Sequence, residues 1–131
     1  MTQLELHQAF LNTSFKVLTN PNITIKINGL VPELSALNSW AFLTAWNPSP
    51  EALSLEENRK RNQNLEEDLK KLGLTYIQGL GISEDEQWSE ESFLIENCTL
   101  EKANELAVKY KQLAFVSGKK DEVAKLIYTI F

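Results

Sequence analysis

The alternation of apolar and polar residues predicts most strands of this chain. Ile23, Ile25 and Ile27 alternate with polar residues, which indicates a strand with one wet face. Residues 40–46 are almost continuously apolar and too short for a buried helix, so they predict a central strand. The other predicted strands cover 15–18, 74–82, 92–96, 113–116 and 122–130, and the intervening stretch 30–38 is predicted as a loop.

Capping residues mark the start of three helices. Thr2 with Glu5, and Ser54 with Glu57, have the spacing of a capping box, and Thr99 is a third N-cap. The first two predicted helices cover 2–12 and 54–72, the second ending before a glycine. The third helix is expected to turn its inner face to the sheet with Leu100, Ala103, Leu106, Ala107 and Tyr110.

These elements predict an α+β fold with a mostly antiparallel or mixed sheet of about six strands. Three helices are expected, with one layer of helices packed on the sheet. The two later helices each follow a pair of strands, which argues against a doubly wound fold. A chain of 131 residues, 43% of them hydrophobic, forms one core, so residues 1–131 are predicted to be a single domain.

The composition limits which cellular compartment and which kinds of metal site are expected. No stretch approaches the length of a membrane helix, the N-terminus lacks a signal-peptide pattern, and the lone Cys98 has no disulfide partner, so we expect a cytoplasmic protein without membrane association. With one histidine and one cysteine the chain has no ligand set for structural zinc, and no metal is assigned. The sequence leaves any cofactor unspecified.

The net charge of -5 comes from one segment. Five acidic residues lie within 84–91, which contains no Lys or Arg, and the remaining acids and bases balance. The chain thus lacks the basic footprint of nucleic-acid binding, which argues against that partner. The segment is interpreted as a solvated loop with Trp88 folded over the sheet, although its carboxylates also suit a divalent cation or a general base.

Polar residues gather where the central strand leaves the sheet. Asn47 and Ser49 lie at this exit, which is a usual place for ligand contacts. Asn58 and Asn62 continue the inward stripe of leucines on the following helix. Either they tie down the 47–54 turn or they line a pocket beside it, and the structural alternative is favoured. Arg59 and Arg61 are interpreted as solvated residues that pair with acids of the first turn.

Two glycines, Gly79 and Gly81, lie in the 74–82 strand. Without a third glycine and a following helix they are a weak phosphate-binding signal, so they are interpreted as marks of a bulge or of close backbone packing.

Several spaced motifs resemble a bacterial family catalogued as domain-of-unknown-function family 3293. They are Ala41-Phe-Leu-Thr-Ala-Trp-Asn-Pro-Ser-Pro-Glu-Ala-Leu-Ser54, Glu57-Asn58, Arg61-Asn62, Gly79-x-Gly81, Trp88-x-Glu-x-Ser92 and Tyr110-x-Gln-x-Ala-Phe115. The resemblance brings no activity with it. It implies a shared pattern that includes Asn47, Asn58, Asn62, Ser92 and Gln112.

Two hypotheses for function follow. The first is a small soluble binding or interaction module that holds a ligand or a protein partner at the Asn47 turn and the start of the 54–72 helix. The alternative is a small enzyme acting on a nucleotide or another polar metabolite, with Glu90 or Glu91 as general base. The lack of a usable histidine or cysteine site favours the first, with Asn47, Ser49, Asn58, Asn62, Ser92 and Gln112 as candidate ligand contacts.

Overall fold

The computed structural model describes residues 2–48 and 51–130. Within this part of the chain the α-helices are α1 (Gln3–Asn12), α2 (Leu55–Lys71) and α3 (Leu100–Lys109), with a 3-10 helix η1 (Pro32–Leu34). The strands are β1 (Ser14–Val17), β2 (Ile23–Ile25), β3 (Ser39–Leu43), β4 (Tyr76–Ile82), β5 (Ser89–Glu96), β6 (Ala114–Lys119) and β7 (Lys125–Tyr128). Among these residues no helix is both long and apolar enough to cross a membrane.

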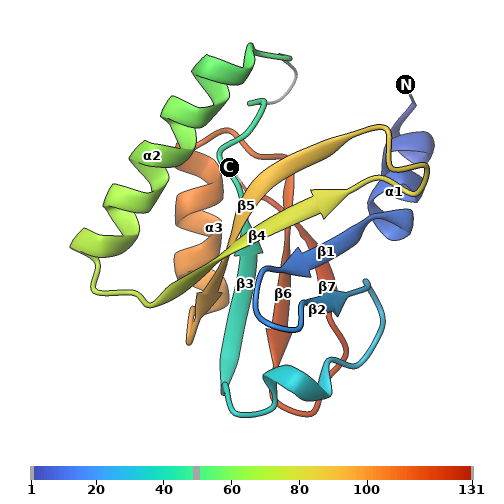
Figure 1. The fold of residues 1–131 in the computed structure, drawn as a ribbon, viewed down its shortest axis with the longest axis vertical. Coiled ribbons are helices and arrows are strands. Elements are labelled where there is room, and N and C mark those ends of the chain that lie inside the picture. The colour runs from blue at the N-terminus through green and yellow to red at the C-terminus, as the bar shows by residue number, and fades with distance from the viewer. Residues whose placement is uncertain (1, 49–50, 131) are drawn as a thin grey trace.

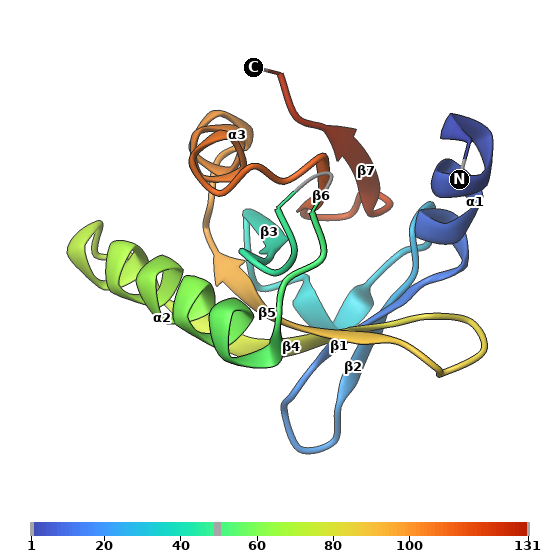
Figure 2. The same cartoon turned by 90° about the horizontal axis from the view of Figure 1, so that it is seen from above.

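The strands form one curled sheet in the order β2-β1-β4-β5-β3-β6-β7, with β3 near its middle. Every pairing is antiparallel. The predicted α+β class is confirmed, and of the two predicted sheet types, mostly antiparallel or mixed, the structure has the antiparallel one. The described residues contain seven strands, close to the predicted six. Seen from above, the sheet bends into a half-barrel with α2 and α3 on its outer face (Figure 1 and Figure 2). Helix α1 lies apart from that layer (Figure 2).

The alternation of side chains along β3 divides the core in two. Ala41 and Leu43 point outward and pack with the inner faces of α2 and α3. Trp40 and Phe42 point inward and pack with residues of β1, β2, β5 and β6 inside the half-barrel. Because both faces of β3 are buried, its sequence is continuously apolar, as a strand covered on two sides requires.

The two edges of the curled sheet meet at one end. The backbone N–H of Asn28, after β2, donates to the carbonyl of Ala124, before β7, at 2.7 Å. The N–H of Ala124 donates in turn to the carbonyl of Gly29 at 2.9 Å. These bonds leave fewer unpaired edge groups and close that end of the half-barrel.

Two glycines allow large rings to approach the strands closely. A Cβ on Gly79 would lie 2.6 Å from the Phe42 ring, and one on Gly118 would lie 2.1 Å from the Trp40 ring. Gly79 pairs in regular register with β1 and β5, so close packing is confirmed and a bulge is absent at this position.

Several predicted strand boundaries differ from the structure, and the contacts explain two of them. Strand β3 ends at Leu43, because the next amides bond to side chains instead of a neighbouring strand: Ala45 N–H donates to Asn62, and Trp46 N–H donates to Thr44. Strand β5 begins at Ser89 instead of residue 92, because its first residues pair with the end of β4. Part of the predicted acidic loop is therefore strand.

The helices begin where the capping residues predict. Both capping boxes are formed and Thr99 accepts a hydrogen bond from Lys102 N–H. The inner face of α3 is confirmed for Ala103, Leu106, Ala107 and Tyr110. The prediction is wrong for Leu100, which is 48% exposed at the first helical position.

Candidate functional site

The end of the half-barrel away from the β2–β7 closure contains a cavity of about 340 Å³. We call it the barrel-end cavity. Its apolar wall includes Leu6, Phe10, Phe15, Phe42, Leu113, Val116 and Leu126. Its polar lining includes Thr44, Asn47, Glu51, Glu90, Ser92 and Gln112. Helix α1, the turn after β3 and strands β1, β4, β5 and β6 thus contribute to one space.

Strand β5 supplies the polar floor of the cavity. Glu90 and Ser92 of β5, and Trp88 directly before it, alternate along the chain and all line the cavity, as a period of two requires. Across the ladder, Glu90 lies opposite Gly81 and Ser92 lies opposite Gly79. Because Gly81 has no side chain, space remains opposite Glu90, whereas the Phe42 ring fills the space beside Gly79.

The Glu90 carboxyl is the main ionisable group of the cavity. Among the described residues no group donates a hydrogen bond to it, and burial raises the pKa of Glu90 from an ordinary 4.5 to about 8. The other charged residue of the described lining is the exposed Glu51. A carboxyl with this pKa is mainly protonated at pH 7, so it can donate a hydrogen bond, or it can ionise when a cation approaches.

Gln112, two residues before β6, also lines the cavity and is 7% exposed. Its Nε2 donates to the carbonyl oxygens of Trp46 at 3.0 Å and Tyr110 at 3.3 Å. These bonds fix the orientation of the amide, and its Oε1 accepts none of the hydrogen bonds formed by the described residues. Gln112 therefore offers an acceptor at the cavity.

The Asn47 turn forms the rim of the cavity. Asn47 has a left-handed backbone with φ of 44°, and its Oδ1 accepts from Leu53 N–H at 2.9 Å and from Asn58 Nδ2 at 2.8 Å. Asparagine tolerates this conformation better than most residues. The side chain thus closes the turn and lies at the cavity at the same time.

Asn58 and Asn62 hold the turn from below and do not line the cavity. Asn58 accepts from Asn47 N–H at 2.7 Å, and its Nδ2 also donates to the Leu53 carbonyl at 3.3 Å. Asn62 accepts from Ala45 N–H at 2.8 Å and donates to the Glu91 carbonyl at 2.7 Å. With exposures of 2% and 6%, both amides act as buried ties between α2, the turn and β5.

Arg59 and Arg61 have other partners than those predicted. Arg61 donates to the carbonyl oxygens of Ala45 and Tyr110, so it joins the same set of ties. Arg59 forms an ion pair with Glu91 at 3.1 Å. The pairing with first-turn acids is therefore wrong, because both guanidinium groups reach across to loops and strands that the helix sequence alone does not reveal.

The structure brings together four of the predicted site residues. Asn47, Glu90, Ser92 and Gln112 line the barrel-end cavity. Ser49 lies outside the described residues. Glu91 follows Glu90 on β5 and points to the opposite face, where it meets Arg59.

The alternation that begins at Trp88 was a signal in the sequence that the interpretation as a solvated loop did not use. The motif Trp88-x-Glu-x-Ser92 has a period of two, which is the signal of a strand face. Applied to this motif, the same rule that identified the 23–27 strand assigns Glu90 and Glu91 to different faces. The local sequence does not predict that Leu6 and Phe10 line the cavity, because this depends on the position of α1 at the end of the half-barrel.

The described lining offers few reactive groups. It includes no histidine, cysteine or lysine, and no three His, Cys, Asp or Glu side chains of the described residues gather closely enough to hold a metal ion. Cys98 is buried in the outer core, where burial raises the pKa of its thiol to about 11. The cavity is therefore equipped for hydrogen bonding and shape recognition.

Residues 43–115 match the model of a family described as Protein of unknown function (DUF3293). The chain belongs to this family. The matched region runs from the end of β3 to β6 and contains the asparagine ties together with Glu90, Ser92 and Gln112. No curated protein and no solved structure matches the chain.

Proposed function

We propose that this DUF3293 protein is a noncatalytic binding module that holds a small molecule in the barrel-end cavity, beside the Asn47 turn and the start of α2. The observation that carries the proposal is the combination of a mostly apolar cavity with two polar groups, the Glu90 carboxyl and Gln112 Oε1, that have no partner among the described residues. Small-molecule sites typically have volumes of about 300–1,000 Å³, apolar walls and a few fixed polar groups.

The ties beneath the rim support this proposal. Asn58, Asn62 and Arg61 bond the backbone of Ala45, Asn47 and Leu53 to α2. A rim held in this way keeps Asn47 in place before a ligand arrives, and a preorganised site loses less conformational entropy on binding. In this proposal Asn58 and Asn62 are positioning residues, whereas Asn47, Ser92 and Gln112 contact the ligand.

The enzyme alternative has less support. A general base needs a substrate proton within reach and usually a partner that positions or activates the reacting group. Glu90 has no histidine, cysteine or lysine beside it in the described lining, and Glu91 is paired with Arg59 on the other face. The binding module is therefore the function that the geometry supports best.

A thermal-shift screen of metabolites, nucleotides and divalent ions tests the proposal. A cavity ligand stabilises the fold by about 2.7 kcal/mol at a concentration of about 100 times its Kd. It should raise the melting temperature of the wild type and of Glu91→Gln, whose altered side chain lies outside the cavity. It should not stabilise Gly81→Leu, because the new side chain occupies the space opposite Glu90.

Ala114→Leu narrows the same cavity from β6 and repeats the test if Gly81→Leu does not fold. A molecule that stabilises both blocked variants as much as the wild type binds elsewhere and contradicts the proposal. A screen in which no molecule stabilises the wild type also contradicts it.

We also propose a cytoplasmic location in a bacterium. The free and buried Cys98 supports it, because a reducing compartment maintains unpaired thiols. The resemblance to a bacterial family supports the source. Fractionation of expressing cells checks the location, and recovery in the membrane or the medium would contradict it.

A further inference from the structure

We propose that the ligand of the barrel-end cavity is a small organic ammonium ion, with its charged head at the Glu90 carboxylate and Gln112 Oε1 and its apolar body against the aromatic wall. This inference rests on the proposed function, because it names the chemical class for the same cavity. It follows from the charge, the hydrogen-bonding groups and the walls of that cavity.

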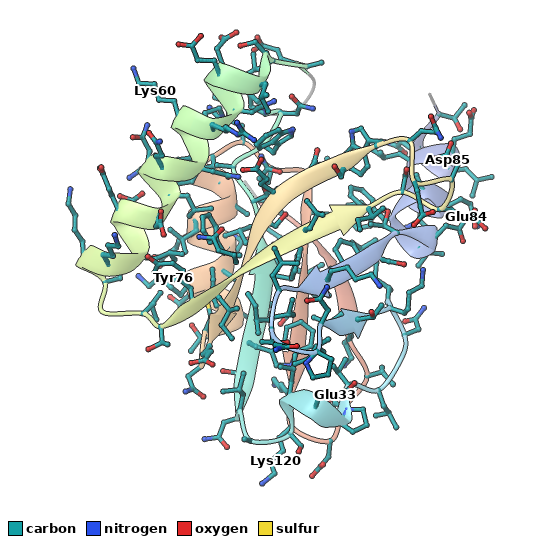
Figure 3. The ribbon with its side chains drawn as sticks, in the orientation of Figure 1. Glu33, Lys60, Tyr76, Glu84, Asp85 and Lys120 are labelled. Atoms are coloured by element: carbon teal, nitrogen blue, oxygen red, sulfur yellow. The ribbon has the colours of Figure 1, made fainter. Side chains whose placement is uncertain are left out.

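The charge of the cavity favours a cation. Its described lining holds two carboxyl groups, Glu51 and Glu90, and no Lys, Arg or His. An anionic ligand would face both carboxyl groups without a compensating positive charge. The whole chain carries a net charge of -5, and Glu84 and Asp85 lie at the tip of the β4–β5 hairpin that also carries Trp88 (Figure 3). This field attracts cations from a distance.

The free hydrogen-bonding groups of the cavity are acceptors, which suits a ligand that donates hydrogen bonds. An ammonium group has up to three N–H donors and no acceptor, as the lysine head group does. Glu90 on β5 and Gln112 before β6 both supply acceptors to the cavity, and neither acceptor is used by the described residues. A charge-assisted hydrogen bond is about twice as strong as one between neutral groups.

Aromatic rings complete the recognition. Phe10, Phe15, Phe42 and Trp88 all line the cavity. The rings of Phe15 and Phe42 pack edge to face, with centroids 5.3 Å apart. Aromatic faces attract ammonium ions, most strongly where water is excluded, and the same rings cover the apolar part of an amine. The wall therefore suits both ends of the proposed ligand.

Binding of an ammonium ion should release a proton. Glu90 holds its proton at pH 7 in the empty cavity, since burial raises its pKa to about 8. The other charged residue of the described lining is Glu51 of the turn, and the described lining residues of α1, β1, β3, β4, β6 and β7 carry no charge. The ion pair requires the carboxylate, so the Glu90 proton passes to the buffer when the cation enters.

Isothermal titration calorimetry on the full chain tests the ligand class with three molecules of similar shape. They are 2-phenylethylamine, which is a cation, 2-phenylethanol, which is neutral, and 3-phenylpropionate, which is an anion. We expect the amine to bind on the order of tenfold more tightly than the alcohol, and the anion to bind most weakly. Titrations at pH 7 in buffers of different ionisation enthalpy should show release of nearly one proton per amine bound.

Two matched variants assign the effect to one carboxyl. Glu90→Gln should remove both the preference for the amine and the proton release, whereas Glu91→Gln removes the same charge from the opposite face and should keep both. Equal binding of the amine and the alcohol overturns the inference, as does amine binding that persists unchanged in Glu90→Gln.

The outcomes also separate the inference from the proposed function. If none of the three molecules binds, while another compound gives stabilisation that the Gly81→Leu substitution removes, the ligand class is wrong and the binding function stands. If no compound gives such stabilisation, the binding function fails and the ligand class fails with it.

Discussion

Glu90 and Glu91 are adjacent on β5 and point to opposite faces of the sheet. The Glu91 carboxylate accepts from Arg59 on the side of α2, with one oxygen 3.1 Å from the guanidinium. The Glu90 carboxyl faces the barrel-end cavity and has no described hydrogen-bond donor. Two neighbours with the same side chain therefore differ in solvation and in charge state, and a pair of identical substitutions can separate their roles.

The first prediction is that Glu90 makes stability fall as the pH rises. Its pKa is about 8 in the folded protein and 4.5 ordinarily, so between these values the folded state holds a proton that the unfolded chain has lost. The contribution of the bound proton to the free energy of unfolding is fully present below pH 4.5 and is lost as the pH rises through 8. Between these values the free energy of unfolding falls by up to about 1.4 kcal/mol per pH unit. Partial exposure of the carboxyl to solvent reduces the total effect.

The Glu90→Gln variant removes this titration. Its free energy of unfolding should be similar to that of the wild type at pH 5 and exceed it by about 3 kcal/mol at pH 9. Urea denaturation at pH 5, 7 and 9 measures the difference. The control Glu91→Gln loses a surface ion pair worth at most about 1 kcal/mol, with a similar effect at pH 7 and 9. A difference between wild type and Glu90→Gln that stays constant with pH would contradict the burial of the Glu90 carboxyl.

The second prediction concerns the ties beneath the Asn47 turn. Asn58→Ala and Asn62→Ala should each lower the free energy of unfolding by about 2–4 kcal/mol, because each leaves buried backbone groups without a partner. The matched control is Asn64→Ala, since Asn64 is exposed on the same helix and should change stability by less than about 0.5 kcal/mol. Urea denaturation of the three variants at pH 7 measures the ranking.

If Asn62→Ala were as stable as Asn64→Ala, the amide would not be a structural tie. In that case a direct contact with ligand would become the better explanation of its place in the family motif. Amide exchange at Ala45 and Asn47, whose N–H groups donate to the two asparagines, gives an independent measurement.

The fold was predictable from the sequence wherever a local rule decides the structure. The capping boxes at Thr2 and Ser54 give the helix starts, and the alternation of Ile23 and Ile25 gives β2. The end of β3 was not predictable, because the side chain of Asn62 competes with a neighbouring strand for the backbone of residue 45. Contacts between segments that are distant in sequence decided the boundary.

The candidate site was predictable in part for the same reason. Asn47 stands out by its place at the exit of an apolar strand, and Ser92 by its place in the Trp88-x-Glu-x-Ser92 motif. Gln112 was predicted only through the resemblance to the family, since no local rule shows that it meets them; that depends on β6 lying beside β3. The charge pattern also led to a wrong prediction for Glu90. The acidic run is typical of a solvated loop, but the curl of the sheet buries this one carboxyl.

The third prediction concerns the closure between the sheet edges. The amides of Asn28 and Ala124 should exchange with solvent deuterium more slowly than the amide of Asp121, which donates no described backbone hydrogen bond. Ala124→Pro removes one donor and should destabilise the fold by about 3 kcal/mol. Rapid exchange at both amides would show that the half-barrel is open at this end in solution.

The fourth prediction compares two glycines on the same strand and the same face. A Cβ at Gly79 would lie 2.6 Å from the Phe42 ring and 3.1 Å from the Lys16 carbonyl oxygen, whereas a Cβ at Gly81 has its nearest neighbour at 3.9 Å. Gly79→Ala should therefore cost about 2 kcal/mol of stability as Phe42 is displaced, and Gly81→Ala should be neutral or stabilising by up to about 1 kcal/mol. Urea denaturation measures both. Equal costs would mean that the space beside Gly81 is filled, and the barrel-end cavity would then be too small for a ligand at Glu90.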